Sequence, residues 1–356
     1  MASLPLDLAA EPCAPVGARR HTTIGDFCTL AKARLSALVV ATSAVGYLMA
    51  ASGPISGARL LITVLGTALA AASANAFNQI VEVERDRRMV RTRQRPLPAG
   101  RLTRRAAITF AVITGVAGPL LLAGLVNMLT AGLALLCLAI YVLVYTPMKT
   151  RSPGNTLVGA VCGALPPMMG WAAVTGGLEL GAWLLGGVLF VWQIPHFLAL
   201  AWLYRDDYAR GGFRMLPLYD PAGGLTCQVT LLYCLTLIPL GLMFTLAGLS
   251  GWFFAAGSVP LAGLLVGLSL RHYRARDAAA ARALFRATLL YLPLFKLLLV
   301  LDRPTPPIVD IRVIDSGPTE VGAAPALPAI HPTDIADYAA SPAASEIAPR
   351  ASKSPE

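Results

Sequence analysis

Charged residues are scarce in this chain of 356 residues: Asp, Glu, Lys and Arg together make up 13% of it. Soluble domains carry about 25% charged residues, so this composition excludes an ordinary water-soluble protein. The charges are also missing from whole stretches rather than thinned evenly along the chain. The uncharged stretches are 35–58, 60–81, 106–148, 152–178, 180–204 and 221–270. Because about 20 apolar residues span a bilayer, this pattern predicts an integral membrane protein.

Cysteine is also sparse, and none of the six cysteines has CxxC or CxH spacing. This excludes a disulfide framework and a cysteine-rich metal cluster. Those in uncharged stretches are expected to fill small apolar spaces; they are Cys137, Cys162, Cys227 and Cys234. The first 25 residues contain Asp7 and Glu11 and no apolar run, so we expect no cleaved signal peptide there.

The uncharged stretches predict an all-α membrane fold with about nine transmembrane helices. Two of them, 106–148 and 221–270, are each long enough for two helices joined by a tight turn. We place these turns near Asn127 and near Ser250–Gly251. A last span is expected near 284–301.

The chain divides into one membrane domain and two tails. The membrane domain is predicted over 26–302. Residues 1–25 are predicted as a flexible cytoplasmic tail. Residues 303–356 are rich in Pro and Ala and have no apolar period, so we expect them to be disordered.

Basic residues gather in alternate loops of the nine-span arrangement. The segment 85–105 alone holds nine arginines, whereas the opposite loops hold little besides Arg59. By the positive-inside rule, the N-terminus and the arginine loop are cytoplasmic and the C-terminus is outside. We therefore expect a multi-pass protein of the inner (plasma) membrane.

Three oxygen-bearing side chains precede the arginine loop at helical spacing. Asn78, Glu82 and Asp86 lie four residues apart and therefore share one helix face. Such a set can hold Mg²⁺ while phosphate oxygens fill the remaining positions. Arg91 and Arg95 follow closely, and guanidinium groups match phosphate geometry. The pattern predicts a metal-bound diphosphate site, although the arginines alone would also suit a simple topology anchor.

Two further basic pairs lie on the same predicted side of the membrane. Lys32 and Arg34 precede the first span, and Lys149 and Arg151 precede the fifth. They are candidate substrate-binding residues because their side chains can reach an anion. They also suit plain inside-positive flanks.

A second acidic loop, LYRDDYARGGFRMLP, follows the sixth span at 203–217. Adjacent acids cannot share one helix face, so we expect Asp207 to face the cavity and Asp206 to face solvent. Asp207 is a candidate catalytic residue. Asp206 and Tyr204 are candidate substrate-binding residues.

His196 lies in the middle of a span, within WQIPHFLALAW. A polar group at this depth is costly and usually faces a cavity, and Pro195 kinks the helix beside it. His196 is therefore a candidate base, hydrogen-bond donor or iron ligand. The alternative is a hydrogen bond between two helices.

Together these blocks resemble the UbiA superfamily of intramembrane prenyltransferases, from Leu30 to Asp302. NQIVEVERD is similar to the family motif NxxxDxxxD, with Glu82 in place of the first Asp. AKARLS resembles the family opening TKPR, with Ala33 in place of the proline, and RTRQRPLPAG is close to RTxxRPLPxG. YTPMKTRSPGNTLVGAVCGALPPMMGW, WQIPHF and YRDDYARGGFRMLP resemble the branch that farnesylates heme. Quinone-type relatives usually carry aspartates where His196 and Leu203 stand.

The resemblance implies an enzyme with its helices around a central cavity. Its substrates would be farnesyl diphosphate and heme b, its products heme O and diphosphate, and its cofactor Mg²⁺. The expected partners are the lipid bilayer and, from pathway logic, a heme A synthase, with no nucleic acid. Two alternatives stay open: a UbiA-type enzyme acting on a quinone precursor or chlorin, and a non-catalytic heme or lipid transporter. Transporters usually bury a charged pair at mid-membrane, whereas charge here gathers at one edge.

Overall fold

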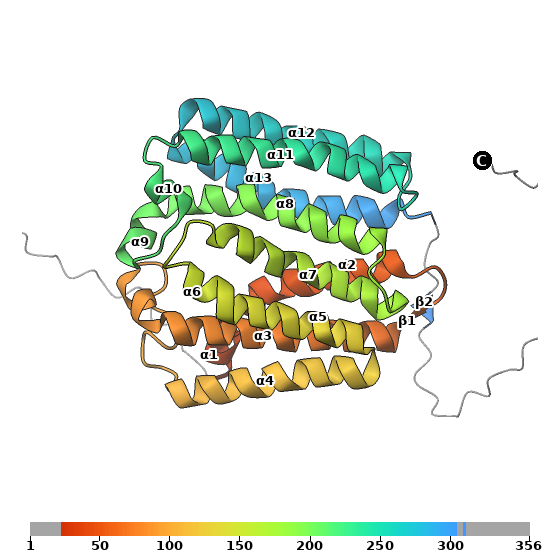
Figure 1. Ribbon diagram of the computed structural model, residues 1–356, viewed down its shortest axis with the longest axis horizontal. Coiled ribbons are helices and arrows are strands. Elements are labelled where there is room, and N and C mark those ends of the chain that lie inside the picture. Colours follow the sequence, from red (N-terminus) through yellow and green to blue (C-terminus); the bar gives the residue numbers. More distant parts are fainter. Residues whose placement is uncertain (1–22, 305–308, 311–356) are drawn as a thin grey trace, which may run out of the picture. The chain divides into compact units, whose positions relative to one another are not determined.

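A computed structural model describes residues 23–304 and 309–310. The long apolar stretches are helical, because a bilayer offers no partner for unpaired backbone groups. Nine helices in the described part are long and apolar enough to cross a membrane (Figure 1). They are α2 (Ala33–Ala50), α3 (Gly57–Arg88), α4 (Arg104–Leu125), the segment Met128–Met148, α7 (Asn155–Thr175), α8 (Leu180–Leu203), α11 (Gly224–Leu246), α12 (Trp252–Ala275) and α13 (Ala278–Leu301). The predicted all-α fold and both predicted tight turns are confirmed.

The fourth span is not a uniform α-helix. It runs through α5 (Met128–Ala139), a π-helical segment η1 (Ile140–Tyr145) and α6 (Thr146–Met148). Isolated π-turns inside α-helices are frequent at functional sites. The sequence pattern gave no sign of this interruption.

Short elements complete the described part. Helix α1 (Thr23–Leu30) precedes the first span, so the last three residues of the predicted N-terminal tail are helical. Helices α9 (Arg205–Arg210) and α10 (Leu216–Tyr219) lie between α8 and α11. Strands β1 (Ile55–Ser56) and β2 (Val309–Asp310) pair in parallel. The rest of the two predicted tails lies outside the described residues.

Helices α7 and α8 form the centre of the bundle. Helix α7 packs against α2, α5 and α8, and α8 also packs against α11 and α13. Glycines allow a close approach between α2 and α7. A Cβ added at Gly170 would lie 1.8 Å from the backbone oxygen of Ser43, and one at Gly46 would lie 2.0 Å from that of Pro167. Small residues of this kind let membrane helices approach to backbone contact.

Helix α3 is longer than a bilayer requires. Its 32 residues extend roughly 48 Å at 1.5 Å per residue, against a hydrocarbon core of about 30 Å. Its last turns therefore reach the membrane edge, at the same end of the bundle as α9 and α10 (Figure 1). Those turns carry the predicted metal-binding side chains.

Candidate active site

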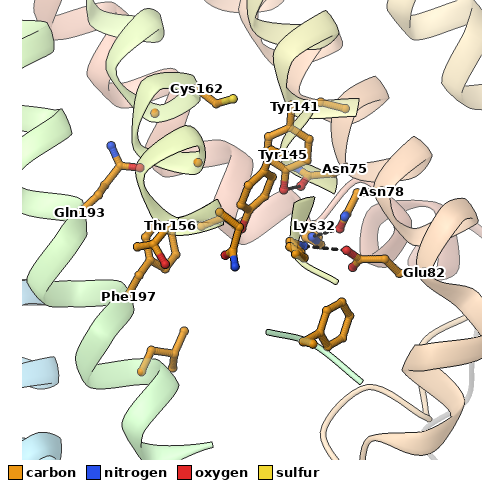
Figure 2. A pocket seen from close by; sticks show the side chains of 18 of the residues that line it. Lys32, Asn75, Asn78, Glu82, Tyr141, Tyr145, Thr156, Cys162, Gln193 and Phe197 are labelled. Carbon is orange, nitrogen blue, oxygen red and sulfur yellow. Dashed lines mark hydrogen bonds and ion pairs between the residues drawn. The ribbon is translucent and has the colours of Figure 1, made fainter. Parts of the chain in front are cut away.

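A cavity of about 390 Å³ lies among α2, α3, the fourth span, α7 and α8 (Figure 2). Its polar end is lined by Lys32, Asn78, Glu82, Asp86, Arg91, Arg95 and Lys149. Its apolar walls include Leu35, Val39, Pro166, Phe197, Leu200 and Met215. The described structure thus joins a charged pocket to an apolar chamber, which suits an amphiphile with an anionic head.

The predicted stripe on α3 faces this cavity. Asn78, Glu82 and Asp86 are all buried, with exposed fractions of 0%, 4% and 1%. Glu84, which is off that face, is exposed and forms a surface ion pair with Arg87. The helical spacing therefore predicted which side chains at this end of α3 line the cavity.

Each member of the stripe contacts one cation from a different segment. Lys149 Nζ lies 2.8 Å from Glu82 Oε1, and Arg95 Nη1 lies 2.7 Å from Asp86 Oδ2. The first contact joins residues 67 positions apart in the sequence, whereas the second joins the end of α3 to the loop that follows it.

Lys32 is the third of these cations, and Lys32 Nζ donates to Asn78 Oδ1 at 3.1 Å (Figure 2). Lys32 joins α1 to α2 in the left-handed backbone conformation, with φ of 49°. That conformation costs an ordinary residue roughly 1–2 kcal/mol. Local strain of this kind concentrates at functional sites.

The amide of Asn78 has a defined orientation. Its Nδ2 donates to Thr146 Oγ1 at 3.2 Å, and that hydroxyl donates to the carbonyl oxygen of Tyr141 at 2.8 Å. The chain of donors leaves Asn78 Oδ1 directed at Lys32 and the cavity. Thr146 was not among the predicted site residues.

Cations outnumber carboxylates at this end of the cavity, and the pKa of Lys32 reflects this in part. Burial lowers the pKa of Lys32 to about 7, helped by the charges of Arg95 and Lys149 and opposed by those of Glu82 and Asp86. Burial also acts to lower the pKa of Lys149, but the Glu82 carboxylate outweighs it and raises that pKa. An anion bound here would relieve the repulsion among the cations.

The donor set fits Mg²⁺ only in company with other oxygen ligands. Among residues 23–304 and 309–310, no cluster of three or more His, Cys, Asp or Glu could hold a metal ion. The stripe offers two carboxylates and one amide oxygen. Mg²⁺ is commonly held by one or two carboxylates together with substrate phosphates and water. The residues therefore suit a metal that arrives with a phosphate ligand.

The prediction that Asp207 faces the cavity is wrong: the side chain is buried, but it does not line the cavity. Its carboxylate accepts hydrogen bonds from the backbone N–H groups of Val90 and Arg91, at 3.0 and 3.2 Å, and from Arg210. Burial acts to raise the pKa of Asp207, but these hydrogen bonds outweigh it and hold the pKa below its usual range. Asp207 thus fixes the turn that carries Arg91.

The aromatic rings of the second loop support the same arginine. The guanidinium of Arg91 lies 5.2 Å from the ring centre of Tyr204 and 5.7 Å from that of Tyr208. Of these two rings, Tyr208 lines the cavity and Tyr204 does not. Asp206 is solvent-facing, with 85% of its side chain exposed.

The second member of each predicted basic pair lies outside the cavity. Arg34 and Arg151 are exposed, whereas Lys32 and Lys149 line the cavity. Each exposed arginine lies two residues after its lysine. Side chains two residues apart on a helical turn point in different directions.

His196 both lines the cavity and bonds another helix. Its Nδ1 lies 2.9 Å from Thr288 Oγ1 on α13. Its ring stacks against Trp192 and Phe285, with centroid distances of 5.0 and 4.9 Å. The two interpretations of this histidine are therefore compatible.

Several cavity residues were missed by sequence reasoning. Tyr141 and Tyr145 line it from η1, and Lys149 Nζ lies 4.7 Å from the Tyr145 ring centre (Figure 2). Gln193 reaches the cavity beside Gly163, where an added Cβ would lie 2.0 Å from Gln193 Oε1. A pair of tyrosines four apart within an uncharged span was the available signal.

The chain is similar to known membrane prenyltransferases. Residues 39–293 match the UbiA prenyltransferase family. A mitochondrial protoheme IX farnesyltransferase of Arabidopsis thaliana is 46% identical over 77% of this chain, which spans only 64% of that relative's length. A protoheme IX farnesyltransferase of Solibacter usitatus is 41% identical, with 78% of this chain and 99% of the relative covered.

Solved structures share the fold at low sequence identity. A structure concerned with digeranylgeranylglyceryl phosphate synthase superposes with a TM-score of 0.67 at 15% identity, covering 78% of this chain and 98% of that one. A UbiA homologue from Archaeoglobus fulgidus, bound to GPP and Mg²⁺, gives 0.55 at 13% identity, with coverage of 77% and 99%. The arrangement of helices is thus the one found in UbiA-type proteins.

Proposed function

Because the chain belongs to the UbiA prenyltransferase family, we propose that it transfers the farnesyl group of farnesyl diphosphate to the C2 vinyl group of heme b. Addition of water completes the reaction, which gives heme O and diphosphate. Relatives that are 46% and 41% identical bear the name protoheme IX farnesyltransferase, which supports this substrate pair. The protein is accordingly a multi-pass membrane enzyme of the prenyltransferase class.

One observation carries the proposal: the stripe of Asn78, Glu82 and Asp86 lies buried at the charged end of a cavity whose remaining walls are mainly apolar. An isoprenoid diphosphate has the same division into an anionic head and an apolar chain. The charged end is rich in cations and would receive the head. The apolar walls would receive the farnesyl chain and the porphyrin.

The basic side chains bind the diphosphate. Lys32, Arg95 and Lys149 exchange their contacts with the stripe for phosphate oxygens. Arg91 approaches from the turn that Asp207 holds. Guanidinium groups bind phosphate oxygens through paired, charge-assisted hydrogen bonds, so this set orients the leaving group before the bond to carbon breaks.

Asn78, Glu82 and Asp86 would hold Mg²⁺ together with phosphate oxygens. When bound, the ion supplies charge neutralisation for the diphosphate as it leaves. A solved UbiA homologue is described as bound to GPP and Mg²⁺, which supports the choice of metal. Glu82 is one methylene longer than aspartate, so its contact with the metal can run through water.

The bonds of the two substrates are then rearranged within the cavity. The C1–O bond of farnesyl diphosphate breaks, and its electron pair leaves with the diphosphate. The vinyl π electrons of heme form the new bond to C1, and the resulting cation takes up water and releases a proton. Walls such as Val39, Pro166 and Leu200 keep water away until the new carbon–carbon bond has formed.

The substrate pair is tested with purified protein, Mg²⁺ and farnesyl diphosphate, supplied with either heme b or 4-hydroxybenzoate. We expect a hydroxyfarnesyl-substituted porphyrin by mass spectrometry and an equal amount of diphosphate, with heme b only. Prenylated 4-hydroxybenzoate would place the enzyme with the quinone-type branch. Heme binding without diphosphate release would indicate a carrier.

We also propose the placement of the protein in its membrane. The arginine-rich end of the cavity is cytoplasmic by the positive-inside rule, so residue 23 is inside and residue 304 is outside. Bacterial relatives support a plasma-membrane location. Heme O is apolar, so a heme A synthase is the partner expected to receive it.

A further inference from the structure

The imidazole of His196 is held on three sides. Trp192 and Phe285 stack on it with interplanar angles of 17° and 24°. Thr288 of α13 contacts its edge, with 2.9 Å between Nδ1 and the hydroxyl oxygen. The same threonine accepts the indole N–H of Trp192 through its backbone oxygen at 2.9 Å. Both the plane and the rotation of the imidazole are therefore fixed.

The hydroxyl of Thr288 sets the tautomer of His196. A hydroxyl has one hydrogen to donate, and that of Thr288 lies 2.7 Å from the carbonyl oxygen of Phe285, to which it donates. Thr288 Oγ1 is left as an acceptor, so His196 Nδ1 must be the donor. In a neutral imidazole protonated at Nδ1, the lone pair is on Nε2.

Nε2 is the free edge of the ring. It makes no hydrogen bond to any residue within 23–304, and His196 lines the cavity beside Phe197 and Leu200. A fixed, unprotonated nitrogen in this position can give its lone pair to a metal ion or accept a hydrogen bond from water. The aromatic stacking favours the first, because it fixes the direction in which the lone pair points.

We infer that His196 Nε2 is the axial ligand of the porphyrin iron. This rests on the proposed function, which places heme b in the cavity. Metal-ligating histidines almost always donate their other ring N–H to an oxygen acceptor, which fixes the tautomer and raises the basicity of the ligand. The chain from His196 to Thr288 to the Phe285 carbonyl is an arrangement of this kind. Thr288 is accordingly a positioning residue for the ligand.

Porphyrin binding by the purified full-length protein tests the inference, with ferric heme b and metal-free protoporphyrin IX as probes. We expect the Soret band of the wild-type heme complex to show nitrogen ligation. His196→Ala should lose that band position and bind heme about tenfold or more weakly. Added imidazole should restore the band. Protoporphyrin IX, which has no iron, should bind both proteins equally, and His272→Ala, which alters a buried histidine outside the cavity, should match wild type.

The role of Thr288 is tested in the same titration. Thr288→Val removes the acceptor and should weaken heme binding by about tenfold while shifting the Soret band. Thr288→Ser keeps the hydroxyl and should restore both. Thr236→Val is the matched control, because Thr236 on α11 is exposed and donates only to its own helix.

Three outcomes would count against the inference, and they differ from one another. A Soret band unchanged in His196→Ala, with heme still bound, would overturn iron ligation. The same unchanged band with loss of product would assign the Nε2 lone pair to water instead. Failure of both heme and protoporphyrin IX to bind the wild-type protein would overturn the proposed function itself.

Discussion

At the scale of the residue, the site depends on oxygen atoms fixed against cations. Asp86 is 1% exposed and lies 2.7 Å from Arg95. Its carboxylate is therefore desolvated and held in one orientation. Asp86 faces the cavity because it follows Glu82 by four residues, which is about one helical turn. Glu84, only two residues away, is exposed and is therefore a surface charge rather than a site residue.

Asp86→Ala should lower kcat on the order of 100- to 1,000-fold, because it removes charge stabilisation of the leaving diphosphate. Steady-state assays of diphosphate release would measure this. Glu84→Ala is the control and should retain wild-type activity, since an exposed ion pair contributes only about 0–1 kcal/mol. Full activity in Asp86→Ala would remove the metal role of the stripe.

Thr146 offers a second test at this scale. Thr146→Val removes the acceptor that orients the Asn78 amide, so we expect the Mg²⁺ concentration needed for half activity to rise by about tenfold. The maximal rate at saturating Mg²⁺ should change little. Thr146→Ser retains the hydroxyl and should restore the Mg²⁺ response, and a Val variant with a normal response would assign Thr146 to packing.

At the scale of the element, the loop after α8 serves the loop after α3. The Asp207 carboxylate accepts hydrogen bonds from the backbone N–H groups of Val90 and Arg91, at the start of the loop after α3. From the sequence, Asp207 was predicted to face the cavity, because adjacent acids cannot share one helix face, but its carboxylate binds the loop after α3 instead. Its partners were not predictable, since Val90 and Arg91 lie more than 100 residues away in the chain.

Asp207→Asn should raise KM for farnesyl diphosphate by about tenfold and leave kcat nearly unchanged, because hydrogen bonds to a charged group contribute about 1.5–3 kcal/mol. The lowered pKa of Asp207 means that this stabilisation is complete above its unfolded pKa of about 3.9 and is lost only as pH falls through the folded value. The ratio of the two KM values should thus be the same at pH 6 and pH 8. Asp206→Asn should match wild type, and a comparable effect there would contradict the assignment.

The contact between α2 and α7 gives a stability prediction. Gly170→Ala places a methyl group against the backbone of Ser43 and should destabilise the bundle by about 1–3 kcal/mol through overpacking. Thermal unfolding in detergent would report a lower Tm. Gly177→Ala, where an added Cβ meets nothing within 4 Å, should leave the Tm unchanged.

At the scale of the whole molecule, the apolar pattern was enough to predict the number of spans. The pairing of charges in the cavity could be seen only in the folded structure. Runs without charge predicted nine helices with turns near Asn127 and Gly251, because bilayer thickness fixes helix length. Thr146, Thr288 and the π-turn η1 escaped prediction. Each depends on contacts between helices that a local pattern does not contain.

The odd number of spans in the described residues supplies a topology test. Full-length fusions with a reporter active only outside the membrane should be inactive at the N-terminus and active at the C-terminus. The arginine-rich loops would hold this orientation by the positive-inside rule. Equal activity of both fusions would contradict the nine-span arrangement.

The size of the cavity has a consequence for where the chemistry takes place. A chamber of about 390 Å³ is near the lower end of the roughly 300–1,000 Å³ that encloses one drug-sized molecule, and a farnesyl chain with a porphyrin exceeds one such molecule. Binding both substrates in the cavity would therefore require the surrounding helices to move apart. Because those helices lie in lipid, turnover should respond to acyl-chain order as well as to the protein.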